Sequence, residues 1–156
     1  MKIEVGQIAP DFTLHNSEKE KITLNDLKGK NVLLLFFPQA FTSTCTKELC
    51  GVRDDFSRYA DANVQVMGIS VDSVFTLAKY KADQHYNFPL LSDFNKEVSA
   101  VYGSLYHDWI LDMKGVSKRS AFIIDKSGII RYAEVLESAG DLPNFDAINT
   151  ILASLN

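Results

Sequence analysis

Val32-Leu-Leu-Leu-Phe-Phe37 is a continuous apolar run that is closed by Pro38. A run without alternation of polar and apolar residues is typical of a strand buried on both faces of a sheet, so it predicts the central strand of the fold. Beyond it, apolar residues recur at alternating spacings of four and three, at Cys45, Leu49, Val52, Phe56 and Tyr59. This stripe predicts a helix from about Thr42 to Ala62, directly after the strand.

The segments on either side extend this strand and helix into a larger pattern. The expected elements are short β segments at 11–14 and 21–24, a one-turn helix at 25–30, a strand at 64–71, a helix at 73–86, a segment at 88–91 that leads to a short helix at 95–102, an irregular excursion at 103–116, strands at 121–125 and 129–134, and a closing helix after residue 143. The central β-α-β unit should be parallel and the last two strands antiparallel. This order predicts a thioredoxin-like α/β fold, with a central mixed β-sheet flanked by helices and an N-terminal β extension.

The length and composition fit one domain over residues 1–156. Hydrophobic residues make up 46% of the chain, which is enough for a single core, and no repeat or linker-like run marks a boundary. The net charge of -4 comes without a basic block, which argues against a nucleic-acid partner. No apolar run approaches the roughly 20 residues that span a membrane, and residues 1–10 lack the pattern of a signal peptide, so a soluble, cytoplasmic protein is expected.

Cys45 and Cys50 are the only cysteines of the chain. So close a pair in a reducing compartment indicates redox or metal chemistry rather than a disulfide framework. If Thr42 is the N-cap of the predicted helix, Cys45 is its third residue, beside unpaired N–H groups and the positive end of the helix dipole, which favour the reactive thiolate. A thiolate can displace the leaving group of a peroxide and become a sulfenic acid. The Thr42 hydroxyl can offer a donor to the oxyanion, and Pro38 can exclude water without adding a donor.

Pro38, Thr42 and Cys45 form the pattern P-x-x-x-T-x-x-C, after an apolar strand and at the start of a helix. In this pattern the chain resembles the peroxiredoxins. The resemblance extends over residues 6–14, 71–73, 88–93 and 119–128. It implies a thiol-dependent peroxidase that reduces hydrogen peroxide and organic hydroperoxides and that needs neither a cofactor nor a metal.

The resemblance also implies roles for individual residues. Cys45 would be the peroxidatic cysteine, Thr42 and Arg119 would orient and activate the thiolate and the peroxide, and Pro38 would shield the site. Glu48, at the acidic position that the family has one turn after this cysteine, would steer Arg119. Without the resemblance, Arg119 could equally be a surface residue at the frayed start of a strand.

Cys50 follows Cys45 by five residues, which in an ideal helix is ~140° of rotation and ~7.5 Å of rise. The Cα separation of ~8 to 9 Å exceeds the roughly 7 Å that a disulfide tolerates, so the pair cannot bond within an intact helix. Cys50 falls with Thr46, Arg53 and Ser57 on a mostly polar side, where packing would not place a cysteine. We therefore expect Cys50 to be the resolving cysteine, which attacks the sulfenic acid after the first helical turns unwind.

The spacing of Cys45 and Cys50 resembles that of the Q-type (bacterioferritin-comigratory) peroxiredoxins. This resemblance implies an intramolecular disulfide that thioredoxin or a similar dithiol reduces. Other segments look more like the alkyl hydroperoxide reductase E type, namely residues 37–45, 91–94 and 127–131. Because members of that type often lack the second cysteine, a one-cysteine mechanism, in which an external thiol resolves Cys45, is an alternative.

Two other classes of protein compete with this interpretation. A thioredoxin-like thiol-disulfide oxidoreductase would also carry two cysteines at a helix entry, but its motif is C-x-x-C, whereas the spacing here is C-x-x-x-x-C. A zinc-binding or redox-sensing module would have to combine the cysteines with His15, His85 or His107, which are scattered along the chain.

Trp109 stands near Tyr102 and Tyr106 in the predicted excursion. These aromatic residues could line an apolar substrate pocket, form an assembly surface or pack in the core. The peroxiredoxin resemblance implies that the partners of the chain are hydroperoxide substrates and a dithiol reductant. The chain is expected to act as a monomer or a homodimer.

Overall fold

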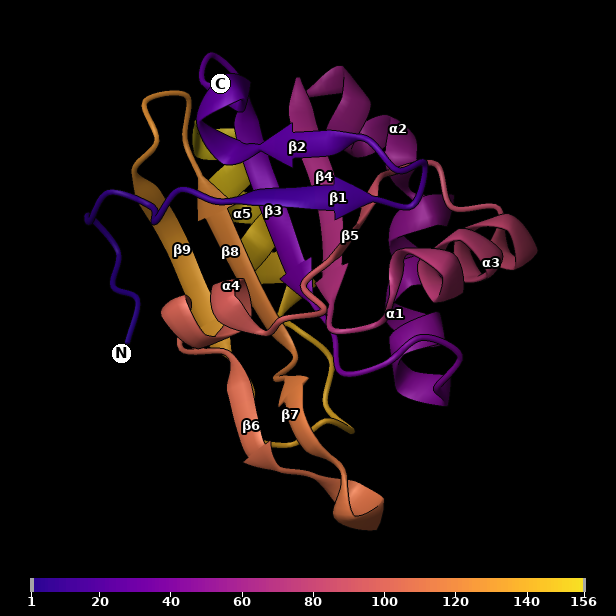
Figure 1. Cartoon of the computed structure of the whole chain (residues 1–156). Coiled ribbons are helices and arrows are strands. Elements are labelled where there is room, and N and C mark those ends of the chain that lie inside the picture. Colours follow the sequence, from indigo (N-terminus) through magenta and orange to yellow (C-terminus); the bar gives the residue numbers. More distant parts are fainter. Residues whose placement is uncertain (1, 156) are drawn as a thin grey trace.

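The computed structural model describes residues 2–155 as a sheet with helices on its faces and a separate two-stranded hairpin (Figure 1). The strands are β1 (Thr13–Asn16), β2 (Lys21–Thr23), β3 (Asn31–Phe36), β4 (Val64–Ser70), β5 (Leu90–Ser92), β6 (Leu105–Asp108), β7 (Lys114–Ser117), β8 (Ser120–Ile124) and β9 (Ile130–Val135). The α-helices are α1 (Ser43–Asp54), α2 (Phe56–Asp61), α3 (Val74–Gln84), α4 (Glu97–Val101) and α5 (Phe145–Ser154). Two short 3-10 helices are η1 (Leu24–Leu27) and η2 (Ile110–Asp112).

Seven strands form the main sheet in the order β2-β1-β5-β4-β3-β8-β9. The three inner strands β3, β4 and β5 are parallel. On one side of them β8 pairs antiparallel with β3, and β9 pairs antiparallel with β8, so β9 again runs in the direction of β3. At the other edge, β1 pairs antiparallel with both β5 and β2. The predicted mixed sheet, its parallel β-α-β unit, its final hairpin and its N-terminal β extension are therefore confirmed.

β3 lies in the interior of the sheet, and all six of its residues are buried. Alternate side chains of a strand point to opposite faces. Leu33 and Leu35 accordingly contact the core that is shared with α1, α2, α3 and α5, whereas Leu34 and Phe36 contact the core beneath β1, η1 and α4. A continuous apolar run is required here because helices or strands cover both faces.

The predicted helix from Thr42 to Ala62 is wrong in one respect, because it breaks at Asp55. This residue has φ -105° and ψ 20°, and its backbone N–H is shared between the carbonyls of Gly51 and Val52, each at 3.2 Å. Its carboxylate accepts a hydrogen bond from the Arg58 side chain at 2.7 Å. The apolar stripe continues across the break, which is why periodicity alone predicts a single helix.

The predicted irregular excursion at 103–116 is also wrong, because it contains an antiparallel hairpin of β6 and β7. Tyr106 pairs with Val116, and Asp108 with Lys114. The hairpin projects from the main sheet below α4 (Figure 1). Its tip turns through left-handed conformations at Leu111 and Asp112, with φ 56° and 61°. Asp112 tolerates this conformation, but leucine does not favour it, and the tip has no Gly or Asn that would indicate a hairpin turn in the sequence.

Candidate active site

Cys45 occupies the first turn of α1, directly after the loop that leaves β3. Thr42 has the extended conformation of an N-cap, with φ -87° and ψ 152°, and its carbonyl accepts a hydrogen bond from Thr46 N at 3.0 Å. Cys45 is therefore the third helical residue, as the sequence predicts, and its side chain is buried. The N–H groups at the start of this first turn have no acceptor within the helix, so they can stabilise a negative charge on the Cys45 sulfur.

Arg119 reaches Cys45 from the segment between β7 and β8. Its side chain is only 1% exposed, and Nη2 donates to Cys45 Sγ at 3.2 Å. Nη1 donates to Glu48 Oε1 at 2.8 Å, while Nε and Nη2 donate to the carbonyl of Ala139 at 3.2 and 2.9 Å. Each nitrogen of the guanidinium thus has a hydrogen-bond partner, which offsets part of the cost of burying the charge, and the group is held against the sulfur.

Glu48 lies one turn after Cys45 on the same helix and is also buried. Burial penalises its carboxylate more than the Arg119 guanidinium favours it, and the nearby Glu134 carboxylate adds to the penalty, so the pKa of Glu48 rises from 4.5 to about 7. Oε1 accepts from Arg119, but Oε2 has no hydrogen-bond partner among residues 2–155. The predicted pairing of Glu48 with Arg119 is present in the structure.

Thr42 and Pro38 form the loop above the thiol. The Thr42 hydroxyl donates to the carbonyl of Gln39 at 2.8 Å and makes no side-chain bond to the helix. The expectation that this hydroxyl offers a donor to an oxyanion is therefore not met, because its one proton is already donated to Gln39. Its oxygen lone pairs remain able to accept a hydrogen bond from a bound ligand. Pro38 is buried directly after β3 and, lacking an N–H, adds no donor to the site.

Asp72 is a residue of the site that the sequence analysis missed. It follows β4, and its Oδ2 accepts hydrogen bonds from Ala40 N at 2.8 Å and from Ser70 Oγ at 2.7 Å. These bonds fix the loop between Pro38 and Thr42 against the neighbouring strand. A polar residue at the carboxyl end of a strand parallel to β3 is the signal that could have revealed it, because such ends meet at one edge of the sheet.

A cavity of about 470 Å³ opens beside Thr42 and Arg119. Its outer wall comes from the β6–β7 hairpin, where the rings of Tyr106 and Trp109 stack with centroids 6.3 Å apart. Tyr102, by contrast, packs in the core on the opposite face of the sheet against Phe36 and is remote from this wall. Of the three aromatic residues considered from the sequence, Tyr106 and Trp109 therefore line a pocket next to the thiol.

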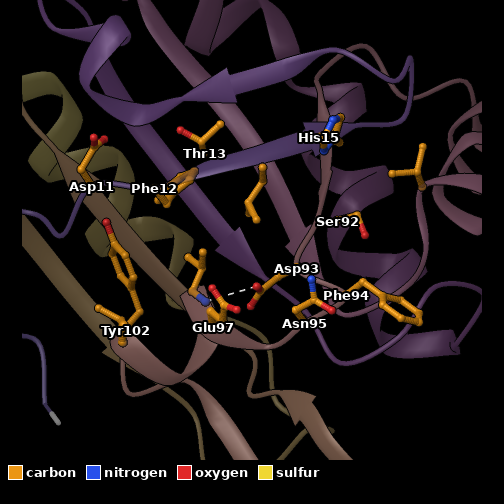
Figure 2. A pocket seen from close by; sticks show the side chains of 14 residues that line it. Asp11, Phe12, Thr13, His15, Ser92, Asp93, Phe94, Asn95, Glu97 and Tyr102 are labelled. Carbon is orange, nitrogen blue, oxygen red and sulfur yellow. Dashed lines mark hydrogen bonds between the residues drawn. The ribbon is translucent and has the colours of Figure 1, made fainter.

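A second cavity, of about 430 Å³, lies between β1 and α4 (Figure 2). None of the six predicted site residues lines it. Asp93 at its base accepts hydrogen bonds from Val98 N at 3.2 Å and Ser99 N at 2.6 Å, so this carboxylate caps α4. The predicted site residues therefore gather beside the first cavity and not in this one.

Cys50 is half-buried in the middle of α1, and both cysteines are free thiols. Its Sγ donates to Gln84 Oε1 at 3.4 Å and lies 3.8 Å from Tyr86 Oη. The sequence predicts a polar side of α1 at this position. In the structure, that side packs against the end of α3 and is only partly exposed to solvent. Periodicity identifies a polar helix face but not the neighbour that covers it.

No metal site or membrane span is found in residues 2–155. No group of three or more His, Cys, Asp or Glu side chains in this part of the chain could hold a metal ion. His85 ends α3 in a left-handed conformation, and His107 is exposed beside Asp108. No helix among the described residues is long and apolar enough to cross a membrane.

Comparisons with known proteins agree on one family. Residues 5–133 match the model of the AhpC/TSA family. The chain is 45% identical over 132 residues to a putative peroxiredoxin bcp of Coxiella burnetii, covering 83% of this chain and 87% of that protein. It is 39% identical over 136 residues to the alkyl hydroperoxide reductase E of Mycobacterium tuberculosis, covering 85% and 86% of the two chains. The crystal structure of the peroxidoxin BcpB from Mycobacterium tuberculosis superposes with a TM-score of 0.86 at 29% identity, covering 99% of each chain.

Proposed function

This chain belongs to the AhpC/TSA family and is a peroxiredoxin, a thiol-dependent hydroperoxide reductase with a thioredoxin-like fold, and we propose that Cys45 is its peroxidatic cysteine. The observation that carries this proposal is the buried Arg119 guanidinium, whose Nη2 lies 3.2 Å from Cys45 Sγ. A fixed positive charge at that distance stabilises a thiolate far more than it stabilises the neutral thiol.

The first step is the attack of the Cys45 thiolate on the terminal oxygen of a hydroperoxide. An S–O bond forms and the O–O bond breaks, leaving a sulfenic acid on Cys45. The departing alkoxide or hydroxide takes up a proton from solvent, which balances the proton that the Cys45 thiol released when it became a thiolate. Arg119 and the N–H groups of the first turn of α1 face the developing negative charge, so they stabilise the transition state more than the ground state. Hydrogen peroxide and organic hydroperoxides both carry the reacting group.

Three further residues support this step. The Thr42 oxygen accepts a hydrogen bond from the hydroperoxide and so orients it, and Pro38 excludes water without competing for the substrate. Glu48 holds the Arg119 fork in place through the contact at 2.8 Å. A charge-assisted pair of this kind fixes the direction of the guanidinium as well as its position.

The second step forms a disulfide between Cys45 and Cys50, which a dithiol such as thioredoxin then reduces. Both residues belong to the continuous helix α1, where their Cα atoms are ~8 to 9 Å apart, so the first turns must unwind before the sulfur atoms can meet. We place this cycle in the cytoplasm, because thioredoxin-type dithiols are kept reduced there. We further propose that the chain forms one domain over residues 1–156 and acts as a monomer or a homodimer.

Turnover of hydrogen peroxide with thioredoxin as reductant tests both roles. Wild-type protein should consume peroxide, Cys45→Ser should be inactive, and Cys50→Ser should lose activity with thioredoxin but keep it with a small external thiol. Unchanged turnover of Cys50→Ser with thioredoxin would instead favour the one-cysteine mechanism.

A further inference from the structure

Helices α1 and α3 lie side by side on one face of the sheet (Figure 1). Polar contacts join them along the side of α1 that carries Cys50. We call these contacts the α1–α3 seam, and its members are Thr46, Cys50 and Arg53 of α1 with Tyr80, Gln84 and Tyr86 of α3 and the residues after it.

The C-terminal end of the seam is strongly tied. Arg53 Nη1 donates to the backbone carbonyl of Gln84 at 2.6 Å. This carbonyl belongs to the last residue of α3, where carbonyls lack helical partners and the dipole favours a cation. Asn87 Nδ2 in turn donates to the carbonyl of Arg53 at 3.3 Å. Both bonds lie beyond Cys50, so they anchor the half of α1 that follows it.

Cys50 itself is oriented by the same anchor. Its Sγ contacts the Gln84 side chain at 3.4 Å and Tyr86 Oη at 3.8 Å. The Tyr86 ring is fixed between Tyr80, at a centroid distance of 5.1 Å, and Phe88, at 5.4 Å. The sulfur therefore lies against a rigid aromatic wall at the end of α3.

The N-terminal end of the seam is weakly tied. A single hydrogen bond joins Thr46 Oγ1 to Tyr80 Oη at 2.9 Å in this part of the described chain. On the opposite side of α1, the turn is held by Arg119 through Cys45 and Glu48. Oxidation of Cys45 to an uncharged sulfenic acid removes the charge that attracts Arg119, so this half of the helix loses part of its support.

We propose that Arg53 and Gln84 are positioning residues, an inference that rests on the proposed function. They keep Cys50 fixed against α3 while the helical turn that carries Cys45 unwinds and moves towards Cys50. The Thr46–Tyr80 bond is the contact of the seam that must break first. Once the sulfur atoms meet, the Cys50 thiolate attacks the sulfenic sulfur, an S–S bond forms and the S–O bond breaks. The departing hydroxide combines with the proton that Cys50 released, giving water, so Cys50 is oxidised as the sulfenic sulfur is reduced.

The test separates the two chemical steps by rapid quenching and intact-mass analysis after one equivalent of hydrogen peroxide. Arg53→Met keeps the aliphatic stem but removes the donor, and it should slow disulfide formation by about tenfold, the effect of losing one charge-assisted hydrogen bond. Arg53→Lys, which keeps a donor, should be close to wild type. Thr46→Val should speed disulfide formation several-fold, because it removes the weaker tie.

In all these variants the rate of Cys45 oxidation should stay within about twofold of wild type, because none of them touches the reacting atoms, and this rate also reports that the variant is folded. Gln84→Met, which removes the acceptor at Cys50, is a second slowing variant that leaves α1 itself unchanged. Excess peroxide should overoxidise Cys45 more readily in Arg53→Met than in wild type.

Equal rates of disulfide formation in wild type, Arg53→Met and Thr46→Val would overturn this inference and leave the role of Cys50 intact. Slowing by Thr46→Val would also overturn it, because the seam would then act as one rigid unit. A wild-type protein that forms no internal disulfide would refute the proposed role of Cys50, a failure that is distinct from either of these.

Discussion

Arg119 and Cys45 are 74 residues apart in the sequence, and their side chains meet at 3.2 Å in the core of the molecule. The same guanidinium donates hydrogen bonds to Cys45 Sγ, Glu48 Oε1 and the carbonyl of Ala139. One planar fork thus links the reactive helix to the segment after β9. The reactivity that we propose for Cys45 accordingly depends on contacts between segments distant in sequence, and it can be tested at each of these contacts.

Replacing Arg119 by lysine should slow the oxidation of Cys45 by roughly 10- to 100-fold. Lysine keeps the charge, but a single ammonium cannot replace the three-way contact of the planar fork. Stopped-flow measurement of the first step with hydrogen peroxide gives the rate directly. A rate within twofold of wild type would mean that charge alone is sufficient and that the fork has no special role.

Glu48 should make the stability of the protein depend on pH. Its pKa is 4.5 as a free carboxyl and about 7 in the folded chain. Because the folded value is the higher, the stability that this group contributes is fully present below pH 4.5 and is lost as the pH rises through 7. The free energy of unfolding of wild type, relative to Glu48→Gln, should fall by on the order of 3 kcal/mol over that interval.

Denaturant unfolding of both proteins across this pH range measures the difference. A constant difference between wild type and Glu48→Gln would show that burial does not shift the pKa of this carboxyl. Glu48→Asp provides the control, because it keeps a titrating group on α1 but is too short to reach Arg119 in the same way.

Asp72→Ala should loosen the loop that precedes α1. The substitution leaves the N–H of Ala40, now bonded at 2.8 Å, without its acceptor, at a cost of about 1 to 3 kcal/mol in the free energy of unfolding. Asp72→Asn keeps an acceptor oxygen and should lose less. Thermal unfolding measures both, and an Asp72→Ala protein as stable as Asp72→Asn would argue against the role of this bond.

Trp109 should report the reaction by fluorescence. It is the only tryptophan of the chain, and it lines the cavity beside Thr42 and Arg119. We expect the Trp109 fluorescence to change in two phases after mixing with peroxide. One phase reports the oxidation of Cys45, and the other reports the unwinding of α1 as the disulfide forms. Cys50→Ser should retain only the first phase, and two identical phases in that variant would contradict the assignment of the second.

The sequence predicts the elements whose signal is local. β3, the entry of α1, the hairpin of β8 and β9 and the closing helix all follow from runs or periodicities within a dozen residues. The position of Cys45 as the third residue of α1 follows in the same way. The break at Asp55 could not be predicted because an apolar stripe continues through it. The β6–β7 hairpin could not be predicted because leucine occupies one of its left-handed turn positions and no glycine or asparagine marks the turn.

The residues of the site likewise fall into two groups, those that a local sequence pattern reveals and those that depend on the tertiary structure. The pattern of Pro38, Thr42 and Cys45 is continuous in the chain and could be found, and the resemblance it carries implies Arg119 and Glu48. The support from Asp72 and the packing of Cys50 against α3 depend on which elements become neighbours in space. Such neighbours are set by the sheet order β5-β4-β3-β8, which no single segment encodes.

The most direct test of the central claim is the mass of the intact protein after one equivalent of hydrogen peroxide. Wild type should contain one internal disulfide between Cys45 and Cys50, and Cys50→Ser should carry a sulfenic or more highly oxidised Cys45. Peptide mapping places each modification on its residue. An unmodified Cys45 in both proteins would contradict the account.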